Sequence, residues 1–120
     1  MRLIVAFIIL SVSLFSQDSL YEQGRILYFE KGCNGCHGVK AAGINTYPAL
    51  ANRAKGFLAY KLTQFRQGTA NTQSAQIMLS FAQSLNDHDI DAITTFLHDF
   101  KDDQKERYNP EFQTWGDGGS

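Results

Sequence analysis

The chain has 120 residues, a formal net charge of −1 and two cysteines. This length accommodates one domain. The near-neutral charge argues against a nucleic-acid partner, which would need a basic excess on one face. The two cysteines lie so close in sequence that a bridge between them would close almost no loop and would add little stability. A domain of this size is marginal unless something else supports it, and a bound group that adds hydrophobic bulk would do so.

The first segment has the layout of a secretory signal peptide. Arg2 supplies a positive charge, an apolar run covers residues 3–15, and small polar residues follow. The run is shorter than the ~20 residues that a membrane-spanning helix needs. We therefore expect a signal peptide over residues 1–16, a mature domain over residues 17–101 and an irregular tail over residues 102–120. The alternative is an uncleaved N-terminal anchor, and only in that case do we expect membrane association.

The mature sequence predicts an all-α fold, because no alternation typical of strands is sustained. A first helix is expected over residues 19–30, with Ser19 as its N-cap and Glu22 three residues later in a capping box. Gly24 inside this helix costs about 1 kcal/mol relative to Ala. We expect that it compensates by letting another helix approach closely. Residues 38–52 contain the glycines and the proline of a loop.

The second half of the domain predicts two more helices. One covers residues 56–67, and the uncharged stretch 69–76 after it indicates an extended loop. Residues 77–85 are expected to contain a short helical turn. The last helix begins after Asn86, a favourable N-cap, and its first turn carries acids where the helix dipole stabilises them. Its apolar residues form one stripe, which consists of Ile90, Ile93, Phe96, Leu97 and Phe100.

The segment KGCNGCHGVK, residues 31–40, contains both cysteines, and a histidine follows the second one directly. Three chemistries compete for this motif. A zinc site normally uses four ligands, typically from two such pairs, and only one pair is present. A thiol redox motif lies between a strand and a helix, and the sequence predicts no strands. The third chemistry is covalent haem attachment, for which Cys-x-x-Cys-His is the pattern.

The spacing of the motif suits this attachment. Two thiols one helical turn apart can add to the two vinyl groups along one porphyrin edge, and the next residue projects its imidazole toward the iron. We therefore predict one covalently bound haem c, with thioether bonds from Cys33 and Cys36 and with His37 as the proximal iron ligand. The attachment takes place outside the cytoplasm, which agrees with the N-terminal segment.

Met78 is the predicted sixth ligand of the iron, because thioether sulfur is a good partner for haem iron and helps to raise its potential. Core filler is the alternative role for this side chain. His88 and His98 are expected to face solvent, and an open sixth position or ligation by His88 remains a further alternative. The carbonyl of Pro48 is the predicted acceptor for the second ring N–H of His37, since metal-bound histidines normally donate it to a nearby group. Pro48 as an ordinary loop residue is the other reading.

These motifs resemble those of the small bacterial class I cytochromes c, over about residues 19–100. CNGCHG resembles the attachment site, YPALANR the proline-containing loop, and FLAYKLTQFRQGTAN the middle helix and the following turn. MLSFAQSLNDHDIDAITTFLHDF resembles the methionine segment and the last helix.

The resemblance implies a class I cytochrome c fold, with three to four helices around one covalently bound haem. It places Gly24 and Tyr28 of the first helix against Ile93, Phe96 and Leu97 of the last. Two features depart from the family pattern. No proline closely precedes the methionine, and the tail is longer than a minimal member needs.

The expected function is that of a periplasmic one-electron carrier between respiratory or oxidoreductase partners, not an enzyme, with no organic substrate. Residues 67–86 carry no charge, so we expect brief encounters with redox proteins at a neutral surface. Two other functions stay open. Phe112 and Trp115 of the tail either pack back on the domain or dock the chain, as a haem subunit, on a larger oxidoreductase. An open iron site would make the chain a ligand-binding haem sensor.

Overall fold

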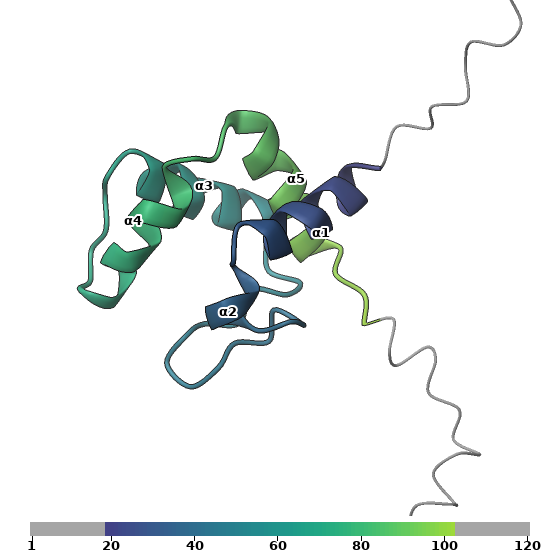
Figure 1. Ribbon diagram of the computed structural model, residues 1–120, viewed down its shortest axis with the longest axis horizontal. Coiled ribbons are helices and arrows are strands. Elements are labelled where there is room, and N and C mark those ends of the chain that lie inside the picture. Colours follow the sequence, from purple (N-terminus) through teal and green to yellow (C-terminus); the bar gives the residue numbers. More distant parts are fainter. Residues whose placement is uncertain (1–18, 103–120) are drawn as a thin grey trace, which may run out of the picture.

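The structure is a computed structural model and describes residues 19–102, all of them helical or in connecting segments (Figure 1). The signal-peptide prediction, most of the tail, Phe112 and Trp115 lie outside the described residues. The described part contains no β-strand and only an isolated bridge between Ile44 and Tyr47. No helix in it has the length and apolarity needed to cross a membrane. The predicted all-α class is confirmed, and the elements are α1 (Leu20–Glu30), α2 (Asn34–His37), α3 (Lys55–Arg66), the 3₁₀ turn η2 (Ser74–Gln76), α4 (Ile77–Ala82) and α5 (Asp87–His98).

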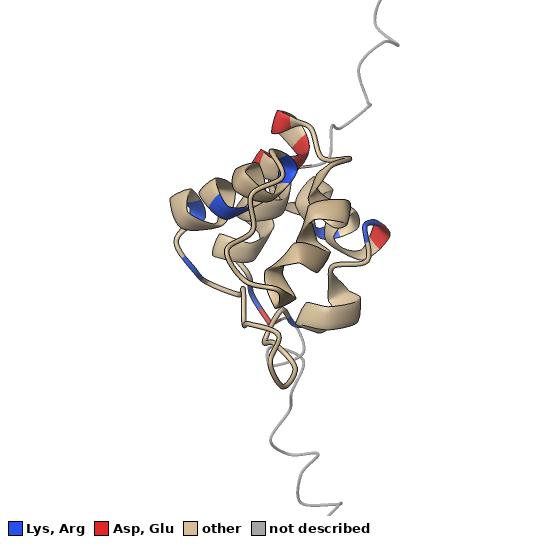
Figure 2. Cartoon of the chain, turned by 90° about the vertical axis from the view of Figure 1, so that its left-hand side faces the viewer, with Lys and Arg blue, Asp and Glu red and all other residues tan. Residues whose placement is uncertain are grey.

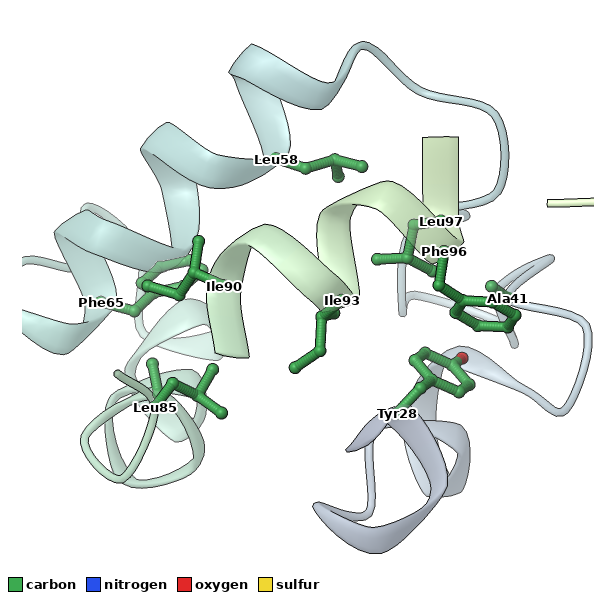
Figure 3. Close-up of a cluster of buried hydrophobic side chains, with 10 residues drawn as sticks. Tyr28, Ala41, Leu58, Phe65, Leu85, Ile90, Ile93, Phe96 and Leu97 are labelled. Carbon is green, nitrogen blue, oxygen red and sulfur yellow. The ribbon is translucent and has the colours of Figure 1, made fainter. Parts of the chain in front are cut away.

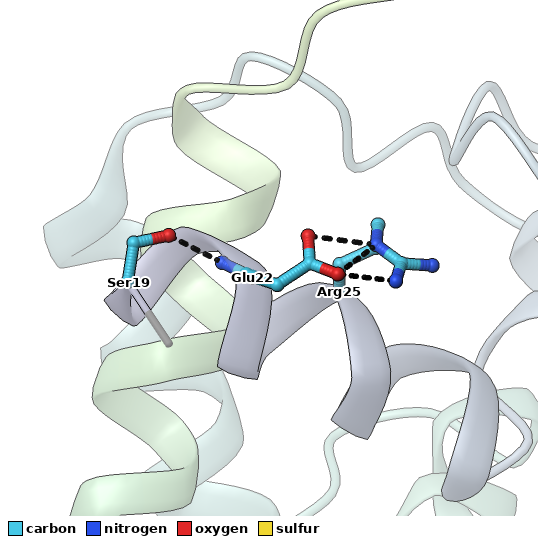
Figure 4. A network of polar contacts seen from close by, with 3 residues as sticks. All are labelled: Ser19, Glu22 and Arg25. Carbon is cyan, nitrogen blue, oxygen red and sulfur yellow. Dashed lines mark hydrogen bonds and ion pairs between the residues drawn. The ribbon is translucent and has the colours of Figure 1, made fainter. Parts of the chain in front are cut away.

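Helix α1 begins at the predicted cap. The Ser19 hydroxyl oxygen accepts a hydrogen bond from the Glu22 N–H at 3.1 Å (Figure 4). The Glu22 carboxylate turns forward to Arg25, whose Nε lies 3.0 Å from each carboxylate oxygen. Half of the predicted capping box is therefore present, because the Arg25 guanidinium engages the carboxylate that would otherwise turn back to the cap.

Helices α1 and α5 cross closely at Gly24, as the sequence predicted. A β-carbon at this position would lie 1.9 Å from the Ala92 carbonyl oxygen and 2.8 Å from Cβ of Phe96. One turn later the ring centroids of Tyr28 and Phe96 are 5.5 Å apart, and both side chains belong to the buried cluster shown in Figure 3. The missing side chain of Gly24 therefore permits the main helix–helix contact of the fold.

Helix α5 has the complete capping box at its start. The Asn86 side chain accepts from the Asp89 N–H at 2.8 Å, and the Asp89 carboxylate accepts from the Asn86 N–H at 3.0 Å. The predicted apolar stripe is buried along the helix, and Phe100 lies half-buried beyond its end. Ion pairs from Lys55 to Asp91 and from Arg66 to Asp87 join α3 to this helix.

The loop between α2 and α3 folds back onto the end of α5. The Asn52 N–H donates to the Leu97 carbonyl at 2.7 Å, and Nδ2 of Asn52 donates to the carbonyls of His98 and Phe100 at 3.1 and 2.9 Å. Asn52 adopts a φ of 61°, a left-handed conformation that asparagine tolerates better than most residues. These contacts fix the loop that carries Pro48.

Helix α3 starts and ends one residue before the predicted bounds, within the usual uncertainty of helix ends. The expected turn within residues 77–85 is α4. The stretch 69–76 is extended only in part, because η2 occupies its last three residues. Thr72 explains this turn, since its hydroxyl accepts from the Ala75 N–H at 3.1 Å and caps the turn in the way that threonine often does.

Candidate functional site

A cavity of about 300 Å³ lies among the helices, with lining residues from each of the five α-helices. This volume falls in the range of about 300–1,000 Å³ that small-molecule and cofactor pockets occupy. Its wall is mainly apolar and includes Leu58, Leu62, Phe65, Ile93 and Leu97. A cavity with such a wall favours a large hydrophobic ligand over a polar one.

The short helix α2 brings the Cys-x-x-Cys-His motif to this cavity. The His37 N–H donates to the Cys33 carbonyl at 3.0 Å, and Cys33, Cys36 and His37 all line the cavity. Both thiols are free and half-buried, and burial raises the pKa of the Cys33 thiol above its usual value. Gly38 ends the helix with a φ of 91°, which favours glycine.

The imidazole of His37 is held at one ring nitrogen. The side chain is 6% exposed, and Nδ1 lies 2.8 Å from the Pro48 carbonyl oxygen, the contact that the sequence predicted. A carbonyl can only accept, so Nδ1 carries a proton, and in the neutral imidazole Nε2 then presents a lone pair. This is the tautomer that a metal-binding histidine needs.

The loop geometry around this contact comes from backbone hydrogen bonds. The Gly43 N–H donates to the His37 carbonyl at 2.8 Å. A β-carbon at Gly43 would lie 2.6 Å from the Tyr47 carbonyl oxygen, so the loop can close this tightly only around a glycine. The buried Tyr28 hydroxyl donates to the Gly38 carbonyl at 2.6 Å and ties the same loop to α1.

Met78 approaches the cavity from a different element. It is half-buried in α4 and lines the cavity together with Ile77 and Phe81. In Figure 1 α4 and α2 lie apart, with the rest of the helical domain joining them. The cavity is therefore lined by a histidine from one segment and by a methionine from another.

The other two histidines lie outside this cavity. His88 is exposed, with Nε2 2.7 Å from Oε1 of Gln23, and His98 is also exposed, with Nδ1 2.9 Å from the Arg53 carbonyl oxygen. The structure thus gathers the five predicted site residues at one cavity and leaves both alternative histidines on the surface.

The two charged lining residues were not predicted as part of the site. Arg53 and Lys61 line the cavity, although the sequence shows them only as members of a basic stretch. The available signal was helical spacing, because Lys61 lies four residues from both Phe57 and Phe65 and shares a face with them.

An all-α domain with a Cys-x-x-Cys-His motif on the wall of an apolar cavity defines a c-type haem protein. Comparison with known proteins gives the family. The sequence profile described as "Cytochrome c" matches residues 21–101. The chain belongs to the cytochrome c family, and the predicted class I cytochrome c fold is confirmed.

Three relatives illustrate the similarity. Cytochrome c4 of Pseudomonas aeruginosa is 35% identical over 83 residues, which cover 67% of this chain and 41% of the relative. Cytochrome c4 of Azotobacter vinelandii is 34% identical and is covered to 40%, again with 67% of this chain. A thiosulfate dehydrogenase electron acceptor of Stutzerimonas stutzeri is 32% identical, over 54% of this chain and 31% of the relative.

A solved structure shares the fold. The crystal structure of reduced recombinant cytochrome c4 from Pseudomonas stutzeri matches with a TM-score of 0.59 and 29% identity, over 66% of this chain and 47% of the other. The chain therefore spans about two fifths of the length of the two curated cytochromes c4 and about half of the solved chain.

The cofactor of this family is haem c, an iron porphyrin bonded covalently to the polypeptide. The described residues fit this group. The cavity wall is apolar, two free thiols lie on it, and the buried imidazole beside them has its Nδ1 engaged and its Nε2 available. The individual roles of Cys33, Cys36, His37, Pro48 and Met78 stay predictions.

Proposed function

We propose that the chain is a periplasmic one-electron carrier and not an enzyme. Cys33 and Cys36 form the thioether bonds to a single haem c, and His37 and Met78 bind its iron. The observation that carries this proposal is that one mainly apolar cavity is lined by His37, whose Nδ1 is bonded to the Pro48 carbonyl, and by Met78 from another helix. Haem c supplies an iron that changes its valence by one electron.

The chain's own residues suit such a carrier. The Pro48 carbonyl accepts from Nδ1 of His37 and so orients the ring and raises the basicity of Nε2. Apolar side chains around the cavity exclude water and favour the less charged, reduced state of a bound iron. Two protein ligands at the iron would leave no position for a substrate, which is why a carrier fits better than an enzyme.

The surface beside Met78 is suited to brief docking. Figure 2 looks at the molecule from the side of α4, and residues 67–86 carry no charge there. On α4, Ile77 is 51% exposed and Phe81 is 37% exposed. The Phe81 ring also lies near Gly32, the residue before Cys33. A β-carbon added to Gly32 would be 3.7 Å from Cε1 of this ring.

We infer that a redox protein docks on this neutral surface through short-range apolar contacts. Rates of electron exchange should therefore change little with ionic strength, because few charges steer the encounter. Stopped-flow rates that fall steeply as salt is added would contradict this docking mode.

Carbon monoxide binding separates the carrier from the ligand-binding sensor. The reduced wild-type protein should not bind carbon monoxide, since Met78 occupies the sixth position, whereas Met78→Ala should bind it readily. Ile77→Ala is the matched control, because Ile77 precedes Met78 and also lines the cavity. Rapid binding by the wild-type protein, or equal behaviour of the two variants, would favour the sensor. The carrier also requires redox titration to yield one electron per chain.

Export to the periplasm is supported by the layout of the N-terminal segment and by the site of haem attachment outside the cytoplasm. The immediate partners are redox proteins that bind transiently. The name of the Stutzerimonas stutzeri relative, an electron acceptor of thiosulfate dehydrogenase, makes an oxidoreductase a reasonable donor. Mixing the oxidised chain with such a reduced enzyme and following its absorbance tests this role directly.

A further inference from the structure

Two cations lie on the cavity wall and have no role in the iron ligation proposed above. Arg53 precedes α3 and Lys61 lies within it, and both line the cavity. Among the described lining residues they are the only ones with a permanent side-chain charge, and no carboxylate lines the cavity. A largely apolar wall with two positive charges fits a large apolar ligand that carries negative groups at its edge.

Both cations lie over aromatic rings. The guanidinium carbon of Arg53 is 5.0 Å from the centroid of the Phe57 ring, and Nζ of Lys61 is 5.2 Å from the centroid of the Phe65 ring. Contacts of this kind attract a cation to the face of the ring. They keep the two charges at the wall of the cavity and limit their movement into solvent.

Several basic residues that do not line the cavity have carboxylate partners instead. Lys40, Lys55 and Arg66 form ion pairs with Asp102, Asp91 and Asp87. Within residues 19–102, neither Arg53 nor Lys61 has a carboxylate partner among the ion pairs. Their donor groups thus remain available for an anion that enters the cavity.

We propose that Arg53 and Lys61 bind the two propionate carboxylates of haem c and thereby raise its reduction potential. Haem c has two ionisable side groups, both carboxylic acids. The two cations of the cavity equal them in number and are opposite to them in charge. The cations stabilise the ionised carboxylates and offset their negative charge near the iron. This favours the reduced state, because reduction removes one positive charge from the iron.

The inference rests on the proposed haem site and deepens it. It is testable by substitution, because the backbone of Arg53 is fixed independently of its side chain. The Arg53 N–H donates to the Leu50 carbonyl at 3.3 Å, and its carbonyl accepts from Nδ1 of His98 at 2.9 Å. Lys61 is internal to α3, where glutamine is also a good helix former.

The other titratable groups near the cavity are common to all variants. The cysteines would be thioethers and His37 iron-bound, and burial raises the pKa of the Tyr28 phenol. Tyr47 also lines the cavity and is present in every variant. His98 on α5 contacts the Arg53 backbone, and Asp99 lies 3.9 Å from His98. These two stay unchanged when Arg53 or Lys61 is substituted.

The test measures the midpoint potential of the purified holoprotein against pH for Arg53→Gln, Lys61→Gln and Lys55→Gln. Lys55→Gln is the matched control, because it removes the same charge from α3 at a residue that does not line the cavity. We expect each cavity variant to have a lower potential than the control at pH 7. The pKa of the haem propionates, obtained from the pH dependence of the potential, should be higher by about 1–3 in these two variants. Arg53→Lys and Lys61→Arg should preserve most of the wild-type profile.

The proposal is overturned if both cavity variants follow the Lys55→Gln profile. If a variant fails to incorporate haem, the wild-type protein still decides. The midpoint potential of the wild-type protein should not change with pH between pH 5 and 8, except for a change that the His98→Asn variant abolishes. A pH-dependent change that persists in His98→Asn contradicts the proposal. A purified chain without covalent haem would refute the proposed function itself, whereas intact haem ligation with unchanged potentials refutes only this inference.

Discussion

The close approach of α1 and α5 at Gly24 gives a sharp test of the fold, by Gly24→Ala. The new β-carbon would lie 1.9 Å from the Ala92 carbonyl oxygen and 2.5 Å from its carbonyl carbon. Both are helix backbone atoms, so no side-chain rotation relieves the clash. To reach ordinary van der Waals contact, α1 has to move away by about 1.5 Å, which also separates Tyr28 from Phe96.

The magnitude follows from two opposed effects. Alanine gains about 1 kcal/mol over glycine in helix propensity. Overpacking of a well-packed contact costs about 1–3 kcal/mol and sometimes more, and the upper end applies because backbone atoms of α5 are in the way. We therefore expect a net loss of about 2 kcal/mol in the free energy of unfolding. For a domain of this size that lowers Tm by about 8–16 °C.

The assay is thermal and guanidinium unfolding of the oxidised holoprotein, followed by circular dichroism and haem absorbance. Gly56→Ala is the matched control, because Gly56 is also helical and a β-carbon added there would meet no other atom within 4 Å. This control should be as stable as the wild type or more stable by up to about 1 kcal/mol. A Gly24→Ala variant that gains stability as Gly56→Ala does would refute the close helix crossing.

Substitutions at three further residues probe caps and loop contacts. Tyr28→Phe should lose about 1–3 kcal/mol in the free energy of unfolding, because the half-buried Gly38 carbonyl loses its donor. Burial also raises the pKa of Tyr28 above its ordinary 10.0, so wild-type stability is full below that pH and falls as pH rises beyond it. Unfolding at several alkaline pH values should show less of this fall in Tyr28→Phe, and an equal fall contradicts the assignment. Asn86→Ala should lose about 1 kcal/mol in the free energy of unfolding, whereas Asn86→Asp should retain most of the stability that the cap provides. Equal denaturation midpoints for the two variants would be inconsistent with capping by Asn86. Asn52→Ala should lose about 1–2 kcal/mol in the free energy of unfolding, since two side-chain hydrogen bonds to the end of α5 disappear. Amide hydrogen exchange at the last turn of α5 should then become faster. Unchanged exchange there would argue against this role of Asn52.

The helices and the motif were predictable because their causes are local. The starts of α1 and α5 depend on apolar periodicity and on the caps at Ser19 and Asn86, and these signals all lie within a few residues of each helix start. The cluster at residues 33–37 is contiguous, so its chemistry can be read without knowing the fold. Met78 and Pro48 needed one further step, namely the requirement that a haem iron has a second ligand and its histidine an acceptor.

The features that the sequence did not predict depend on distant contacts or on local competition. Arg53 and Lys61 appear as ordinary basic residues until the fold places them on the cavity wall. Asn52 donates to carbonyls at the end of α5, more than forty residues away in the sequence. A local sequence pattern cannot predict such a contact. At Glu22, two partners were available for one carboxylate, and the pairing with Arg25 displaced half of the capping box.

Covalent haem with His37 and Met78 as its iron ligands is the central claim, and absorption spectroscopy of the purified, exported protein tests it most directly. We predict sharp bands of a low-spin haem c in the reduced state, a far-red methionine-to-iron band in the oxidised state that Met78→Leu abolishes, and colour that stays with the polypeptide in acidified organic solvent. A colourless protein, or one whose pigment is extracted by that solvent, would contradict the account.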